Sequence, residues 1–136
     1  MLKGTVGDVM HKGVIACDAG ASVREAITQL DEHRIHALVV TDGPGYMTGL
    51  VSQTDVMRAW RQGGDYDKVM NQPVSNIMTK SVITCMPHAT LERAAHMLTE
   101  HKIHRLVVVE EHNDGRIWPI GILSMTDIVR ELSDDD

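Results

Sequence analysis

Runs of apolar residues and helix-period apolar faces recur in the same order twice along the chain. The segments Leu38–Thr41 and Leu106–Val109 are rich in β-branched residues without polar alternation, which predicts strands covered on both faces. Short apolar segments precede them at Val14–Cys17 and Val82–Cys85 and predict one more strand in each copy. Each copy is therefore expected to contain strand, helix, strand, strand and helix, in that order.

Amphipathic helices lie between these strands. Ser22, followed three residues later by Glu25, predicts a capping box that opens the first helix, and Thr90 stands at the equivalent place of the second. Glycine-led segments at Gly49–Val51 and Gly121–Leu123 predict a third strand in each copy, which runs into Ser-x-Thr-Asp and a closing helix. The apolar helix faces comprise Val23, Ala26, Ile27 and Leu30 in the first copy, and Leu91, Ala94, Ala95 and Leu98 in the second.

The two halves are similar enough to indicate a tandem duplication. Two copies favour a closed pair related by a pseudo-twofold axis over a solenoid, which needs about three or more repeats. We expect repeat 1 over residues 1–62, a linker over 63–73, and repeat 2 over 74–136 with an acidic tail at Asp134–Asp136. The aligned segments are Asp8–Lys12 with Asn76–Lys80, Glu32–Val40 with Glu100–Val108, and, after a longer loop in the second half, Gly49–Val56 with Gly121–Ile128.

Composition narrows the classes of function. The 136 residues include 13 basic and 19 acidic side chains, for a formal net charge of −6. The lack of a basic stripe, with two Trp, two Tyr and no Phe, argues against nucleic-acid binding, which needs cationic and stacking surfaces. Apolar runs fall far short of the ~20 residues of a membrane span, and the N-terminus lacks the apolar region of a secretory signal. With two cysteines, these features predict a cytoplasmic protein that contacts neither nucleic acid nor membrane.

The duplicated pattern resembles paired CBS domains, the modules named after cystathionine β-synthase, of which two form a Bateman module. The resemblance rests on D/N-[VI]-M near the start of each copy, the I-H-x-L-V-V segment and the closing G-[LI]-[VL]-S-x-T-D-[VI]. It implies an α/β (α+β) fold with β-α-β-β-α in each repeat, packed sheet to sheet, with two clefts. It also implies a regulatory ligand that contains adenosine, such as AMP, ADP, ATP or S-adenosylmethionine, no required cofactor, and control of a separate partner protein.

The Ser52-Gln53-Thr54-Asp55 segment stands at the end of a predicted strand and the start of a helix. Unpaired backbone N–H groups and hydroxyls there suit a phosphate, and a carboxylate can accept both hydroxyls of a ribose. The alternative is helix capping alone, since Ser, Thr and Asp are preferred N-cap residues. The resemblance implies that the aspartate holds ribose and that the Ser and Thr side chains reach ribose or phosphate.

A second segment enters the central strand of the second copy. His104 and Arg105 resemble a His-Arg pair in the nucleotide-sensing gamma subunit of AMP-activated protein kinase, where such a pair contacts phosphate. Arginine suits that role because its planar guanidinium presents a fork of donors. In the first copy His36 is followed by Ala37, which has no charge to offer.

The resemblance implies that each cleft combines the Ser-x-Thr-Asp of one repeat with strand residues of the other. Because the second combination lacks a cation and one hydroxyl, we expect two unequal sites. The first site would comprise Ser52, Thr54, Asp55, Thr84, His104 and Arg105, and the weaker second site Ala16, His36, Ala37, Ser124, Thr126 and Asp127.

Other interpretations remain open at this stage. The sequence contains no motif of nucleophilic, metal-dependent or phosphate-loop catalysis, so we do not expect an enzyme. A scaffold or interaction protein is the alternative, with metal held by the His-x-x-His pairs His33/His36 and His101/His104. Cys17 is expected to be a packed thiol, as is its equivalent in the second copy. We also expect a homodimer, formed through the closing helices at Val56, Trp60, Ile128 and Leu132.

Overall fold

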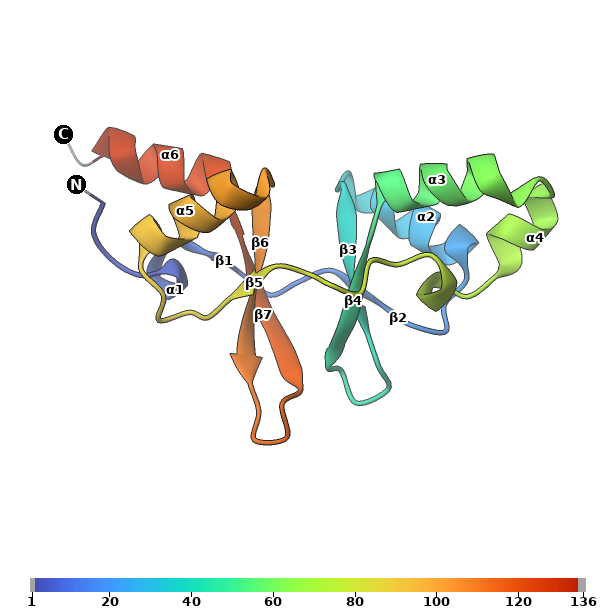
Figure 1. Ribbon diagram of the computed structural model, residues 1–136, viewed down its shortest axis with the longest axis horizontal. Coiled ribbons are helices and arrows are strands. Elements are labelled where there is room, and N and C mark those ends of the chain that lie inside the picture. Colours follow the sequence, from blue (N-terminus) through green and yellow to red (C-terminus); the bar gives the residue numbers. More distant parts are fainter. Residues whose placement is uncertain (1, 135–136) are drawn as a thin grey trace. The chain divides into compact units, whose positions relative to one another are not determined.

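The element order predicted for each repeat is confirmed by the computed structural model, which describes residues 2–134. The fold is mixed α and β, with two small sheets (Figure 1). Repeat 1 forms β2 (Ala16–Asp18), α2 (Val23–His33), β3 (Ala37–Thr41), β4 (Met47–Ser52) and α3 (Gln53–Gly63). Repeat 2 forms β5 (Thr84–Cys85), α5 (Leu91–His101), β6 (Arg105–Glu111), β7 (Ile117–Ser124) and α6 (Met125–Asp134).

Among residues 2–134, four short elements lie outside that scheme. Helix α1 (Val6–Val9) and strand β1 (His11–Lys12) precede the first predicted strand of repeat 1, and helix α4 (Tyr66–Asn71) and the 3-10 helix η1 (Val74–Asn76) precede the first strand of repeat 2. The segment expected to be a linker, residues 63–73, therefore contains a helix. Asp65 begins α4, because its side chain accepts a hydrogen bond from the backbone N–H of Asp67 at 3.1 Å.

Two compact units make up the molecule. Unit 1 comprises Met1–Val14 and Ile83–Asp136, and unit 2 comprises Ile15–Val82. Among the described residues, the sheet of unit 1 has the strand order β1-β7-β6-β5 and that of unit 2 has the order β2-β3-β4. In each, the central strand of the repeat pairs parallel with the strand before its helix and antiparallel with the strand after it.

Each unit has its own apolar core, made by the segments that the sequence predicts. Leu38 and Val40 of β3 are fully buried in unit 2, as are Leu106 and Val108 of β6 in unit 1. The apolar faces of α2 and α5 cover the strand face that bears these residues. Val39 and Val107, which point to the opposite face, are also buried, so the strand sequences do not alternate. Ser22 and Thr90 cap the two helices, each accepting a backbone hydrogen bond at 3.1 Å. Within residues 2–134, the reciprocal hydrogen bond to the Glu25 side chain that a capping box requires is not formed.

The segment that leads into each repeat packs in the unit of the other repeat. We call these leading segments 1 (residues 5–12) and 2 (residues 73–80). In leading segment 1, the backbone N–H of Val6 donates to the carbonyl of Ala89 at 2.8 Å, and β1 pairs with β7. In leading segment 2, Thr79 and Leu50 exchange two backbone hydrogen bonds, at 2.8 and 2.9 Å. The compact units therefore cross the repeat boundaries of the sequence.

Glycine is required where each leading segment crosses the third strand of the repeat. A Cβ atom at Gly49 would lie 2.8 Å from the carbonyl oxygen of Thr79 and 2.7 Å from Sδ of Met78. One at Gly121 would lie 2.6 Å from the carbonyl oxygen of His11. The glycine in each G-[LI]-[VL]-S motif thus allows the two backbones to approach.

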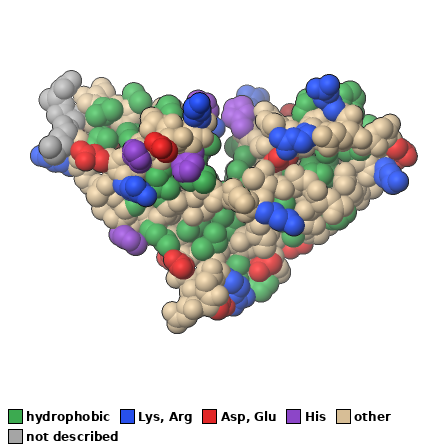
Figure 2. All heavy atoms as spheres, in the orientation of Figure 1, with side chains coloured by type: hydrophobic (Ala, Val, Ile, Leu, Met, Phe, Trp, Pro, Cys, Tyr) green, Lys and Arg blue, Asp and Glu red, His purple; other side chains and the backbone are tan. Residues whose placement is uncertain are grey.

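The ends of the chain complete the comparison with the sequence. Asp134 is the last residue of α6, while Asp135 and Asp136 of the expected acidic tail lie outside the described residues. Within residues 2–134, no helix has both the length and the hydropathy that a membrane crossing requires. On the face drawn in Figure 2, basic and acidic side chains are scattered among one another.

Candidate functional site

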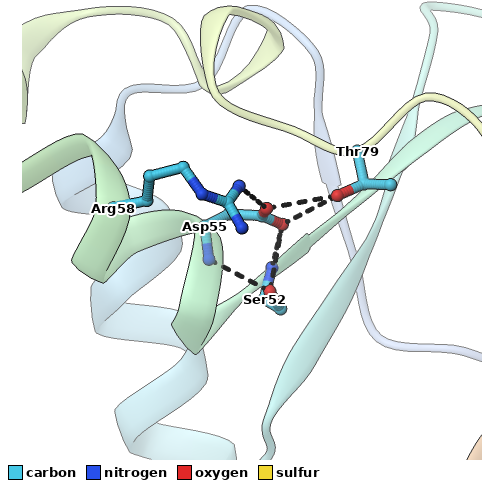
Figure 3. Close-up of polar contacts among 4 residues, drawn as sticks. All are labelled: Ser52, Asp55, Arg58 and Thr79. Atoms are coloured by element: carbon cyan, nitrogen blue, oxygen red, sulfur yellow. Dashed lines mark hydrogen bonds and ion pairs between the residues drawn. The ribbon is translucent and has the colours of Figure 1, made fainter. Parts of the chain in front are cut away.

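The Ser-x-Thr-Asp segment of repeat 1 forms a capping box at the start of α3 (Figure 3). The backbone N–H of Ser52 donates to Oδ2 of Asp55 at 2.9 Å, and the Asp55 N–H donates to the Ser52 hydroxyl oxygen at 3.1 Å. The Ser52 hydroxyl also donates to Oδ2 of Asp55, at 3.0 Å. The capping expected from these residue types is therefore present.

Two further residues reach the other carboxylate oxygen of Asp55. The Thr79 hydroxyl donates to Oδ1 at 3.1 Å, and Nη1 of Arg58 donates to it at 3.3 Å. The Asp55 side chain is only 4% exposed, and we call Ser52, Asp55, Arg58 and Thr79 the Asp55 cluster (Figure 3). Thr79 comes from leading segment 2, so this segment supplies part of the cluster.

An equivalent cluster lies in unit 1 at the start of α6. The Ser124 N–H donates to Oδ2 of Asp127 at 2.8 Å, and the Asp127 N–H donates to the Ser124 hydroxyl oxygen at 3.1 Å. Nε2 of His11 lies 3.0 Å from Oδ1 of Asp127, and Nη1 of Arg130 lies 3.7 Å from it. We call His11, Ser124, Asp127 and Arg130 the Asp127 cluster. Here His11, from leading segment 1, takes the place that Thr79 has in unit 2.

The carboxylate of Asp127 is held in its charged form. Burial opposes ionisation, but hydrogen bonds from Ser124 and the neighbouring His11 outweigh it and hold the pKa of Asp127 below its ordinary value. An ionised carboxylate only accepts hydrogen bonds, so Nε2 of His11 carries the proton in this contact.

The two carboxylates differ in how many acceptor positions are already used. An ionised carboxylate offers about four. Asp55 receives Thr79 and Arg58 on Oδ1 and two donors of Ser52 on Oδ2, so its positions are filled. Within residues 2–134, Asp127 receives one hydrogen bond on each oxygen, from His11 and Ser124. A diol that binds Asp55 must therefore displace a present donor, whereas Asp127 can accept two more hydrogen bonds.

The remaining predicted residues of unit 2 lie near the start of β3 and on the first turn of α3. Ala37 is the register partner of Ser52 across β3 and β4, so the two side chains share a face of the sheet. His36 is exposed, and its Nδ1 lies 3.1 Å from Oε1 of Gln53. Thr54 is exposed, and Ala16 begins β2.

Unit 1 repeats this arrangement with a charged residue. Arg105 is exposed and is the register partner of Ser124, so the structure brings Arg105 to the strand end that carries the Asp127 cluster. His104 is exposed, and its carbonyl accepts a hydrogen bond from the backbone N–H of Met125 at 2.8 Å. Thr84 is half-buried in β5 opposite Val107. Thr126 is exposed on the first turn of α6.

The metal and thiol interpretations can be examined residue by residue. Within residues 2–134, no three His, Cys, Asp or Glu side chains are arranged to hold a metal ion. His33 and His101 are the last residues of α2 and α5, so each His-x-x-His pair is split between a helix end and the strand approach. Both cysteines are buried free thiols. Burial raises the pKa of Cys85 to about 11, and burial with nearby acidic residues raises that of Cys17.

Four cluster residues were not among those predicted from the sequence. Arg58 and Arg130 occupy equivalent positions, three residues after each aspartate, and this repetition is visible in the aligned halves. Thr79 and His11 are also equivalent, directly after the methionine of each D/N-[VI]-M motif. The equivalence of these residues is visible when the two halves are aligned. The alignment does not show that a leading segment contacts an aspartate.

Comparison with known proteins gives a consistent family. The model of the CBS domain matches residues 6–62 and 74–134. The CBS domain-containing protein YhcV of Bacillus subtilis (strain 168) is 27% identical over 128 residues, which make up 93% of this chain and 88% of that protein. Homoserine O-acetyltransferase of Methanocorpusculum labreanum is 33% identical over 109 residues, but the chain spans only 21% of that enzyme.

Solved structures give the same result for the fold. The CBS domain pair of protein MJ0100, in complex with 5′-methylthioadenosine and S-adenosyl-L-methionine, has a TM-score of 0.79 and 26% identity, and the match covers 98% of each chain. CBSX2 in complex with AMP has a TM-score of 0.79 and 30% identity, over 96% of this chain and 97% of that one.

Proposed function

Because the chain belongs to the CBS domain family, with two CBS domains in tandem, we propose that it is a regulatory module for an adenosine-containing ligand. The observation that carries the proposal is the similarity over nearly the whole chain to CBSX2, whose structure contains AMP. The likeness to the pair of MJ0100 with its two adenosyl ligands supports the same ligand class. AMP, ADP, ATP and S-adenosylmethionine are the ligands to test, and a separate protein is the proposed target of regulation.

The proposed ribose acceptors are the two buried aspartates. Asp55 would take a ribose with help from Ser52 and Thr54, and Asp127 would take another with help from Ser124 and Thr126. Support comes from the helix starts on which both lie, where backbone N–H groups and the positive end of the helix dipole favour an anionic ligand. His104 and Arg105 are proposed to contact phosphate, and Thr84 the ligand beside them.

Ligand binding then has a different cost at the two aspartates. A diol at Asp55 replaces at least one donor, and the hydroxyl of Thr79 can give way by rotating about one bond. A diol at Asp127 adds to the existing hydrogen bonds. We therefore propose that the two sites are unequal. The cation of Arg105 and the hydroxyl of Thr84 favour ligand binding at the first predicted site. The unused acceptor positions of the carboxylate favour binding at Asp127.

A homodimer is also part of the proposal, with one correction to its expected surface. Ile128 is 4% exposed and belongs to the core of unit 1, so it cannot contact a partner. The neighbouring Val129 and Leu132 are exposed on α6, as are their equivalents Met57 and Trp60 on α3. In unit 2, Val56 lines an apolar groove of about 310 Å³. The other residues of the groove are Val23, Ile27, Met57, Trp60, Tyr66, Val69 and Met70.

Thermal unfolding in the presence of single ligands tests the function. A ligand that binds the folded state at 100 times its dissociation constant adds about 2.7 kcal/mol to the free energy of unfolding. We expect at least one of AMP, ADP, ATP and S-adenosylmethionine to raise the melting temperature. The double variant Asp55→Ala/Asp127→Ala should show no such rise. A shift with Zn²⁺ and with none of the four adenosyl ligands would instead favour the metal-binding alternative.

A further inference from the structure

Arg58 and Arg130 occupy the same position in the two clusters. Each follows its aspartate by three residues and therefore projects from the same side of the closing helix as the carboxylate. Nη1 of Arg58 lies 3.3 Å from Oδ1 of Asp55, and Nη1 of Arg130 lies 3.7 Å from Oδ1 of Asp127. The structure therefore places a cation beside each proposed ribose acceptor, within a single unit in both cases.

These contacts are poorly suited to a purely structural role. The side chains of Arg58 and Arg130 are 57% and 63% exposed, and each approaches its carboxylate through one nitrogen rather than as a two-point pair. Ion pairs of such exposure contribute little to folding. A guanidinium has five N–H donors in a planar fork. Most of the donors of each arginine therefore remain available to a ligand at the aspartate.

The charge of the whole chain makes a local cation important. With a formal net charge of −6, the protein repels an anionic ligand at long range, and a neighbouring arginine offsets this repulsion. The forked donors of arginine match phosphate oxygens, and the 5′-phosphate of a nucleotide is attached to the ribose through C5′.

We propose that Arg58 and Arg130 contact the phosphate of the ligand whose ribose is held by the aspartate of the same cluster. The inference rests on the proposed function and deepens it, because it assigns phosphate recognition to both repeats. Sequence comparison had singled out Arg105 as the one cation at a site, with Ala37 in its place in the first repeat. In contrast, each repeat has a cluster arginine, Arg58 in the first and Arg130 in the second.

The test compares ligands that differ only in phosphate. Adenosine and AMP are titrated by calorimetry against the wild type, Arg58→Gln, Arg130→Gln and the double variant. The loss of a charge-assisted hydrogen bond corresponds to roughly a tenfold to hundredfold change in affinity. We expect the double variant to bind AMP at least tenfold more weakly and adenosine within about twofold of the wild type. Arg58→Lys should recover part of the AMP affinity, since it restores the charge without the fork.

Arg61→Gln is the matched control. It removes the same charge from the same helix, one turn beyond Arg58, and should change AMP affinity by less than about twofold. Melting of each ligand-free variant confirms that it is folded. Equal weakening of adenosine and AMP, or an equal effect of Arg61→Gln, would overturn this inference alone. A wild type that binds S-adenosylmethionine but no ligand with a phosphate would also overturn this inference alone. Failure of the wild type to bind adenosine, AMP, ADP, ATP and S-adenosylmethionine would overturn the proposed function together with it.

Discussion

Nε2 of His11 lies 3.0 Å from Oδ1 of Asp127, although the two residues are 116 positions apart in the chain. The contact exists because leading segment 1 pairs with β7 rather than with its own repeat. Thr79 makes the equivalent contact with Asp55 in unit 2. Each proposed ribose acceptor is therefore held by the segment that leads into the other repeat, and this exchange underlies the first two predictions.

Val6 and Val74 test the exchange directly. They are equivalent in the two leading segments, and both are fully buried, in the cores of unit 1 and unit 2 respectively. We expect each change to Ala to cost about 1.5–3 kcal/mol of unfolding free energy. Val6→Ala should raise hydrogen exchange most in α5 and β6, and Val74→Ala most in α2 and β3. The opposite pattern of exchange, in which each change loosens its own repeat, would contradict the exchanged packing.

Gly49→Ala and Gly121→Ala should be strongly destabilising. The new methyl group would meet backbone atoms of leading segments 2 and 1, at 2.8 and 2.6 Å, and a backbone cannot move aside as a flexible side chain can. Overpacking of this kind costs about 1–3 kcal/mol, measured by urea unfolding. Gly43→Ala is the control, since nothing lies within 4 Å of its added Cβ. Three variants of equal stability would show that no close crossing exists.

The stability of unit 1 should depend on the charge of Asp127 at acid pH. Its folded-state pKa lies below the ordinary value of 3.8. The stabilisation is therefore complete above that value and is lost as the pH falls through the folded-state pKa. Asp127→Asn should lower stability at pH 7 by about 1.5–3 kcal/mol and should reduce the acid-induced loss. Urea unfolding between pH 7 and pH 3 measures both, and parallel curves for wild type and variant would exclude the effect.

Both cysteines should be unreactive in the folded protein. The thiolate is the reacting form, and the raised pKa of Cys17 and Cys85 makes it scarce near neutral pH. Burial also keeps reagents away from the sulfur atoms. We expect slow modification by a thiol reagent at pH 8 and rapid modification of both residues in urea. Rapid labelling of the folded protein would indicate that one of the two cores opens frequently.

Trp60 is the residue on which we expect dimerisation to depend most. It is 56% exposed beside the apolar groove of unit 2, and removal of a large aromatic anchor from an interface costs about 2 kcal/mol or more. Trp60→Ser should raise the dimer dissociation constant at least tenfold, measured by sedimentation. Trp118→Ser removes a tryptophan from β7, away from the closing helices, and should leave the dimer dissociation constant unchanged. A monomeric wild type at micromolar concentration would rule out the dimer.

The repeated elements could be predicted because their signals are local. Apolar runs such as Leu38–Val40 identify buried strands, and Ser22 and Thr90 identify helix starts from the chemistry of capping. Helix α4 was missed because Gly63 and Gly64 suggested a break in structure. Asp65, a residue type preferred at N-caps, and the apolar Val69 were weaker sequence signals for the helix that the structure contains.

The exchanged packing could not be predicted for a different reason. The leading segments have nearly the same pattern, Asp8-Val9-Met10 and Asn76-Ile77-Met78, and the strands they cross both carry glycine. Either segment therefore suits either repeat, and only the path of the chain decides between them. The contacts of His11 and Thr79 with the aspartates follow from that choice.

The exchange of leading segments also makes the two repeats poor candidates for separate expression. A fragment that ends before residue 73 would hold leading segment 1, which belongs to the absent unit, and would lack the segment that completes its own. Two separately expressed repeats would have to exchange their leading segments by associating as two molecules. In the intact chain the tether supplies each segment at an effective concentration in the millimolar range. Joining the two repeats in one chain therefore converts an association between two molecules into an intramolecular step of folding.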